Sequence, residues 1–103
     1  MSEVEAAARA HARRVLAGDP GVRADLAPDA EVEPADLFDR LLGGAFRGFE
    51  LVAHARIGAH HIFKTKYVGS TILIVQARWV LSPGGRWQVH EAQLVRVAVE
   101  EGV

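Results

Sequence analysis

Five polar side chains interrupt strand faces that are otherwise apolar, and they are the groups best placed to do chemistry. Side chains alternate between the two sides of a strand, so a run with apolar residues at every second position turns one face toward the core. Glu91 and Gln93 follow Trp87 and Val89 at this spacing. We therefore predict that five polar residues enter one interior: His61, Thr65, Tyr67, Glu91 and Gln93.

These residue types point to acid–base chemistry without a cofactor. Desolvation in an apolar cavity raises the pKa of a carboxyl group, which would suit Glu91 to act as a general acid or base near neutral pH. A histidine or tyrosine could supply a second proton donor or an orienting hydrogen bond. The expected catalytic residues are Glu91, His61 and Tyr67, and the expected ligand-binding residues are Thr65, Gln93, Phe63, Trp79 and Trp87.

The same residues also have structural interpretations. A β-bulge after His90 would turn Glu91 outward, because one extra residue shifts the alternation that follows it. Glu91 could instead pair with a lysine or arginine at the rim of the cavity. Tyr67 could be a packed aromatic residue whose hydroxyl finds a partner at the mouth of the pocket.

Alternation over the C-terminal half predicts the sheet that would carry these residues. Residues 71–99 read as two long strands joined by a turn at 82–85, and residues 51–57 and 61–67 alternate in the same way. We predict a four-stranded antiparallel sheet whose odd-numbered residues face the interior. The odd positions of the first long strand are all apolar: Leu73, Val75, Ala77, Trp79 and Leu81.

The N-terminal half has the spacing of helices. Ser2 can cap a first helix, with a capping-box glutamate three residues later, and Gly18 is a typical helix stop. A short helix is predicted over residues 22–26 and another from Pro34. Residues 31–33 could form a short edge strand.

Length and composition limit the possible classes of protein. The 103 residues correspond to a single α+β domain, residues 1–103, with room for one core. The net charge of −1 does not indicate a nucleic-acid-binding protein, and the absence of cysteine fits a reducing compartment. No run approaches the roughly 20 apolar residues of a membrane helix, and the N-terminus lacks the apolar segment of a signal peptide. We expect a cytoplasmic protein that binds neither nucleic acid nor membranes.

The even-numbered strand positions form an outer face that mixes aliphatic and basic side chains. One interpretation is a basic patch for phosphate or nucleic acid. A dimer face is the preferred interpretation, because nucleic-acid surfaces usually add stacking aromatic residues and none occupies these positions. The expected homodimer contact comprises Val52, His54, Arg56, Ile72, Ile74, Gln76 and Arg78.

The five histidines do not predict a metal site. His60 and His61 are neighbours on a strand and point to opposite faces, so they cannot share an ion in regular structure. His54 and His90 could approach each other across the sheet, but no acidic residue obviously completes a site. His11 reads as an ordinary helix residue.

Three short motifs, spread over nearly the whole chain, together resemble a known family. They are Leu16-Ala17-Gly18-Asp19 followed by Leu26-Ala27-Pro28-Asp29-Ala30-Glu31-Val32, Phe46-Arg47-Gly48 before the first long strand, and Gly85-Arg86-Trp87-Gln88-Val89 before the last. The chain resembles the SnoaL-like and ketosteroid isomerase-like proteins of the nuclear transport factor 2-like superfamily, which have the cystatin-like α+β cone.

The resemblance implies that the N-terminal helices pack into the concave face of a curved sheet and enclose an apolar pocket. It also implies that dimers form through the sheet. Ketosteroid isomerases need an aspartate base, a tyrosine and a protonated acid. No aspartate follows Asp39, and the first helix has no tyrosine, so that activity is not expected here.

Two functions from different classes follow. The first is a protein that binds a small apolar metabolite, with a cofactor-independent isomerase, cyclase or hydrolase activity if it is an enzyme. The second is a non-catalytic dimerisation or protein-interaction module whose pocket is filled by its own side chains, with Phe63, Trp79 and Trp87 as the plug. The volume of the pocket discriminates them, because a drug-sized ligand needs at least about 300 Å3.

Overall fold

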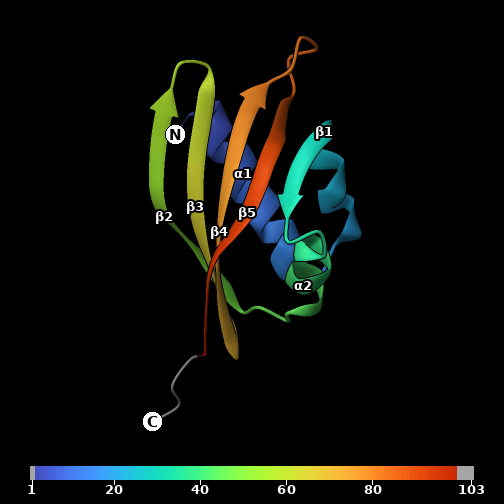
Figure 1. Cartoon of the computed structure of the whole chain (residues 1–103), viewed down its shortest axis with the longest axis vertical. Helices are drawn as coiled ribbons and strands as arrows, with labels where there is room; N and C mark the ends of the chain where they lie inside the picture. The colour runs from blue at the N-terminus through green and yellow to red at the C-terminus, as the bar shows by residue number, and fades with distance from the viewer. Residues whose placement is uncertain (1, 100–103) are drawn as a thin grey trace.

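The computed structural model describes residues 2–99 and has the α+β architecture that the sequence predicts (Figure 1). Its sheet has five strands in the order β1-β5-β4-β3-β2. All neighbours are antiparallel except β1 and β5, which are parallel. The elements in chain order are the helix α1 (Glu3–Leu16), the 3-10 helix η1 (Pro20–Asp25), β1 (Leu26–Glu33), α2 (Leu37–Gly43), β2 (Gly48–Ile57), β3 (His60–Val68), β4 (Thr71–Leu81) and β5 (Trp87–Val99).

The helix ends follow local chemistry. The Ser2 hydroxyl accepts a hydrogen bond from the Glu5 amide at 3.2 Å, which confirms the predicted cap of α1. The chain leaves α1 through Gly18 at a φ of 66°, a left-handed conformation that glycine adopts without steric cost. The carboxylate of Asp19 then accepts from the Gly21 amide at 2.8 Å and begins η1, which replaces the short helix predicted over residues 22–26.

The predicted four-stranded sheet did not include β1, of which only the last three residues were expected to be extended. Only residues 31–33 were expected as an edge strand, whereas β1 spans Leu26–Glu33 and pairs with β5. Pro28 and the acidic side chains around it have low strand propensity, so the pairing comes from tertiary contact with β5 rather than from local preference. The meander β2-β3-β4-β5 has the predicted order and direction.

Three β-bulges in the antiparallel strands β2 to β5 bend the sheet and change which side chains face inward. Val52 is the extra residue on β2, where the pairing passes from Leu51–Thr65 to Ala53–Lys64. His90 and Val95 are the extra residues on β5. Each bulge reverses the alternation beyond it, so odd-numbered residues face inward throughout β3 and β4 but only along parts of β2 and β5.

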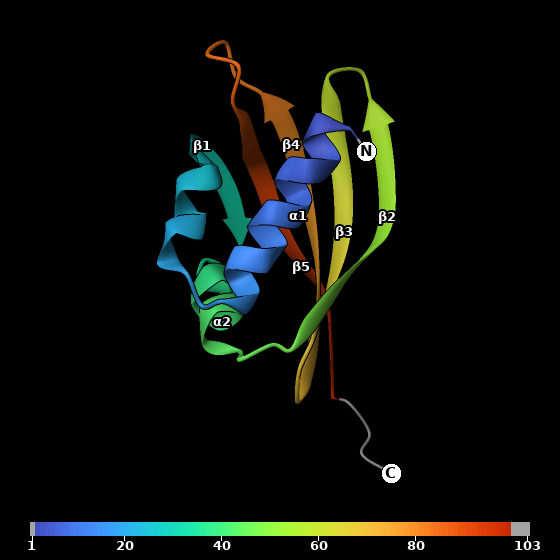
Figure 2. The ribbon, with the colours of Figure 1, turned by 180° about the vertical axis from the view of Figure 1, so that it is seen from behind.

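The core lies between the helices and the inner face of the sheet. In Figure 2, α1 crosses the sheet on this face and α2 lies beside its lower end. Leu73, Val75 and Trp79 are buried there, which confirms the inward face predicted for β4. The first residues of β4 (Thr71 and Ile72) and the last residues of β5 (Val97–Val99) extend beyond the helices (Figures 1 and 2). We call these two segments the projecting end.

Candidate functional site

The interior of the cone is almost completely filled. The inner face of the sheet and the two α-helices leave a void of about 10 Å3, bordered by His11, Thr65, Tyr67 and Trp79 among others. One water molecule needs about 10 to 15 Å3 by this measure, and a drug-sized ligand needs hundreds. The predicted apolar pocket is therefore reduced to the space of a single water.

The predicted ligand-binding residues that reach the interior are the ones that fill it. Phe63, Trp79 and Thr65 are buried in the core. Trp87 is half-buried and meets His61 edge to face, with ring centroids 5.4 Å apart. Its indole Nε1 is buried and has no hydrogen-bond partner among residues 2–99. These residues act in this structure as packing groups.

Tyr67 lies in the interior as predicted. Its ring is buried and packs against Phe46 at a centroid distance of 5.6 Å. Burial raises the pKa of the Tyr67 phenol well above its ordinary value of 10.0, because the phenolate would lose its hydration. Tyr67 is therefore a neutral hydrogen-bond donor at physiological pH, and a catalytic role for it stays a prediction.

His61 also faces inward, but it lies at the rim of the sheet, away from the interior void. Its Nδ1 is 3.2 Å from Nε2 of His54, whose ring stacks on Phe63 at 4.1 Å. Partial burial lowers the pKa of His61, and the neighbouring charges of Arg56 and His54 lower it further. His61 is thus a neutral imidazole near pH 7, held by aromatic packing.

Glu91 and Gln93 were expected in the interior and lie on the outer face instead. Because His90 is bulged, the pairing of β5 with β4 passes from Trp79–Val89 to Arg78–Glu91, and Gln93 then pairs with Gln76. The bulge that we considered for Glu91 is therefore present. Glu91 and His61 occupy opposite faces of the sheet, so the predicted catalytic residues do not form one site.

His54 and Arg56 move the other way. They were expected on the outer face, but the bulge at Val52 reverses the alternation of β2 and turns both inward. His54 pairs with Phe63 and Arg56 with His61. The outer face at this end of β2 consequently presents Ala53, Ala55 and Ile57.

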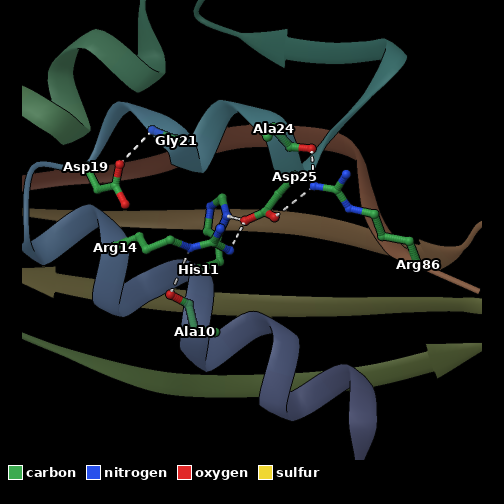
Figure 3. A network of polar contacts seen from close by, with 8 residues as sticks. All are labelled: Ala10, His11, Arg14, Asp19, Gly21, Ala24, Asp25 and Arg86. Atoms are coloured by element: carbon green, nitrogen blue, oxygen red, sulfur yellow. Dashed lines mark hydrogen bonds and ion pairs between the residues drawn. The ribbon is translucent and has the colours of Figure 1, made fainter.

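A buried ionic network joins α1 to η1, and sequence analysis did not predict it (Figure 3). The Asp25 carboxylate accepts a hydrogen bond from Nδ1 of His11 at 2.8 Å and one from Arg14 at 2.5 Å. Arg86, in the β4–β5 loop, approaches the second carboxylate oxygen at 3.8 Å and donates to the Ala24 carbonyl at 2.7 Å. Asp25 and His11 are both buried.

The electrostatics of this network keep Asp25 ionised. Burial alone would raise the pKa of the Asp25 carboxyl, but the hydrogen bonds and charges of His11 and Arg14 outweigh it and hold the pKa below 3.8. An ionised carboxylate can only accept, so His11 carries a proton on Nδ1. Phe38 and Trp79 hold the imidazole edge to face at 5.8 and 5.4 Å.

The signal for this network is present in the sequence. Val4, Ala8, Ala12 and Val15 form the apolar stripe of α1, and His11 interrupts it. A polar residue on a buried helix face needs a partner, as does a polar residue on a buried strand face. The partner Asp25 is not predictable from spacing, because it comes from a 3-10 turn after the helix.

An imidazole oriented by a carboxylate is the usual arrangement of a general base. His11 has that geometry, and its ring borders the same void as Thr65 and Tyr67. The void has no room for a substrate beside the ring, so His11 and Asp25 link helix to turn in this conformation. No group of three or more potential metal ligands gathers within residues 2–99, and no helix there is long and apolar enough to cross a membrane.

Comparison with known proteins identifies the fold. An NTF-2-like protein of unknown function from Silicibacter pomeroyi is similar over 94% of this chain and 99% of its own, with a TM-score of 0.64 and 9% identity. An NTF-2-like protein of unknown function from Burkholderia xenovorans is similar over 97% of this chain and 86% of its own, with a TM-score of 0.59 and 15% identity. No protein-family model and no curated protein matches the sequence. The chain therefore has the NTF-2-like fold.

Proposed function

We propose that this chain is a non-catalytic assembly module that forms a homodimer through the outer face of its sheet. The filled cone is the observation that carries this proposal. A void of about 10 Å3 leaves no room for a metabolite inside the cone, whereas ligand sites in proteins usually occupy about 300 Å3 or more. The alternative, an internal acid–base site of Glu91 with His61 or Tyr67, has its side chains on different faces of the sheet.

The outer face of the sheet has the mixed character of a protein contact. A shallow groove of about 360 Å3 is lined by aliphatic side chains and by two cations, and its residues are Val52, Lys66, Ile72, Ile74, Arg96 and Ala98. Acidic residues alternate with basic ones, since Glu50 pairs across the strands with Lys66 and Glu91 with Arg78. Aliphatic area flanked by both signs of charge favours association of two identical faces about a two-fold axis.

The same face is poorly suited to nucleic acid. Its basic residues Lys64, Lys66, Arg78 and Arg96 are accompanied by acidic residues. The aromatic residues of the sheet lie on inward-facing positions, at Phe49, Phe63, Tyr67, Trp79 and Trp87. Stacking platforms for bases are thus absent from the outer face within the described strands.

A small-ligand function is the second candidate, and the orientation of His11 favours it. A small apolar ligand that entered the water-sized void would contact the His11 ring together with Thr65 and Tyr67. This function requires the cone to widen. NMR titration with small apolar probes such as benzene tests it: perturbation of the His11 and Tyr67 resonances supports ligand binding, and unchanged resonances exclude it for those probes.

Sedimentation velocity at micromolar concentration tests the dimer. Val52 is 44% exposed and lines the groove next to Lys66 and Arg96, so Val52→Lys adds a third cation to an apolar contact without disturbing the core. We expect this variant to have a lower mass than the wild type, with at least about tenfold weaker association. Leu81→Lys is the matched control. Leu81 is 47% exposed, like Val52, but it belongs to the inward-facing set of β4 residues and so does not lie on the proposed dimer face. A monomeric wild type, or an unchanged mass in Val52→Lys, would contradict the proposal.

A further inference from the structure

The last part of β5 has a neighbouring strand on one side only. The pairing of β1 with β5 ends at Glu33 and Gln93, whereas β4 continues beside β5 as far as Val99. Within residues 2–99, no strand therefore lies along the outer edge of Leu94–Val99. Unpaired N–H and C=O groups along such an edge are a template for another strand.

The side chains of this edge are apolar and exposed. Val95, Val97 and Val99 are 47%, 54% and 74% exposed. On the same strand, where β1 is present, Val89 and Ala92 are 0% and 1% exposed. Clustered aliphatic residues on a free strand edge are uncommon in monomers and mark contact sites.

A groove with both apolar and polar lining residues adjoins this edge on the inner face. Its volume is about 500 Å3, and it runs between α2 and the projecting end, with Phe46, Leu73 and Val97 among its lining residues. Val97 belongs to both the edge and the groove. A strand added along β5 would therefore place its own inward side chains beside the apolar part of this groove, at Phe46, Leu73 and Val97.

We infer that the occupant of this edge is β5 of a second copy of the chain, added antiparallel about a two-fold axis at Val97. In that register Val97 faces Val97 of the second copy, and Arg96 faces Ala98. Aliphatic residues then meet aliphatic residues, and the two guanidinium groups are kept apart. Centring the axis one residue earlier would set Arg96 directly against Arg96, which like-charge repulsion disfavours.

This contact differs from the proposed dimer face, although Arg96 and Ala98 belong to both. The outer-face dimer uses side chains around Val52 and Ile74, those of Arg96 and Ala98 included, whereas the edge contact uses the backbone of Arg96–Val99. Both contacts are isologous, so together they build an assembly larger than a dimer. The edge contact does not depend on the proposed function, and either can exist without the other.

Val97→Lys tests the edge contact, because it sets two ammonium groups against each other at the two-fold axis. By sedimentation velocity we expect Val97→Lys to be smaller than the wild type, and Leu81→Lys to match the wild type. Val52→Lys separates the two proposals. If only the edge is used, Val52→Lys keeps the wild-type mass; if only the outer face is used, Val97→Lys does.

Backbone hydrogen exchange gives a second readout. The amides of Arg96–Val99 that point away from β4 should exchange at least about tenfold more slowly in the concentrated wild type than in Val97→Lys, because a neighbouring strand accepts their hydrogen bonds. Equal exchange in the two proteins, or a wild-type mass for Val97→Lys, overturns the inference. Protection of these amides that does not change with protein concentration also overturns it, since a second copy would then not be its cause.

Discussion

The covered and the projecting parts of the sheet differ in whether their apolar side chains are buried. Beneath α1, the apolar face of β3 and β4 is packed so closely that only a water-sized void is left, and the buried charge of Asp25 is fully paired. At the projecting end, Val97 and Val99 of the same sheet stay exposed. The same sheet therefore has one part whose apolar side chains are sealed from solvent and another whose apolar side chains lie where a second chain can reach them.

Phe63→Ala should produce the largest effect and test the covered part. Phe63 is buried at 1% exposure, so its removal should lower the free energy of unfolding by about 3 to 5 kcal/mol in urea titrations. Val97→Ala should change it by less than about 0.5 kcal/mol. If the two variants cost the same, the contrast between the covered and projecting parts is wrong.

Asp25→Asn should have an intermediate effect that depends on pH. Because the folded pKa of Asp25 is lowered, its contribution to stability is complete above the ordinary value of 3.8 and is lost as the pH falls through the lowered value. Arg14 and Arg86 are already partly exposed, so water can solvate them when the Asp25 charge is removed. We therefore expect Asp25→Asn to lower the free energy of unfolding by about 2 kcal/mol at pH 7.

The acid limb of the stability curve distinguishes this mechanism from simple loss of packing. The difference between the wild type and Asp25→Asn should shrink when urea titrations are repeated below pH 3.8. The exposed pair of Arg23 and Asp39 offers a matched control, since Asp39→Asn should cost less than about 1 kcal/mol. A constant difference across pH would contradict the role of the Asp25 charge.

Glu91→Gln should have the smallest effect on folding. Glu91 lies on the outer face opposite Arg78, so its neutralisation should change the free energy of unfolding by less than about 0.5 kcal/mol. The measurement is again urea unfolding, and a large change would indicate that Glu91 is buried. Such a result would contradict the placement of Glu91 on the outer face and favour the prediction that Glu91 enters the interior.

Much of the fold could be predicted because its signals are periodic. The alternation that ends in Leu73, Val75 and Trp79 identified the inward face of β4, and Ser2 identified the start of α1. The bulge at His90 was considered because Glu91 and Gln93 break the apolar alternation, but the pattern alone did not decide between a bulge and a polar interior; the bulge at Val52 was not predicted. They moved Glu91, His54 and Arg56 to the opposite faces.

The candidate site was harder to predict than the fold. Tyr67 and Thr65 reach the interior as expected, since they lie on a strand without a bulge. Whether the interior is open depends on how the volumes of Phe38, Trp79 and the α1 side chains add up in three dimensions. His11 was visible as an interruption of an apolar stripe, but its partner Asp25 depends on a tertiary contact.

The parallel pairing of β1 with β5 has a consequence for how the chain is made. Residues 26–33 emerge from the ribosome well before their strand partner, which lies at residues 89–93. Arg86, which holds the carbonyl of Ala24, emerges equally late. The N-terminal third therefore cannot reach its final arrangement until β5 has been synthesised, and β1 must wait for a partner that lies about 60 residues later in the sequence.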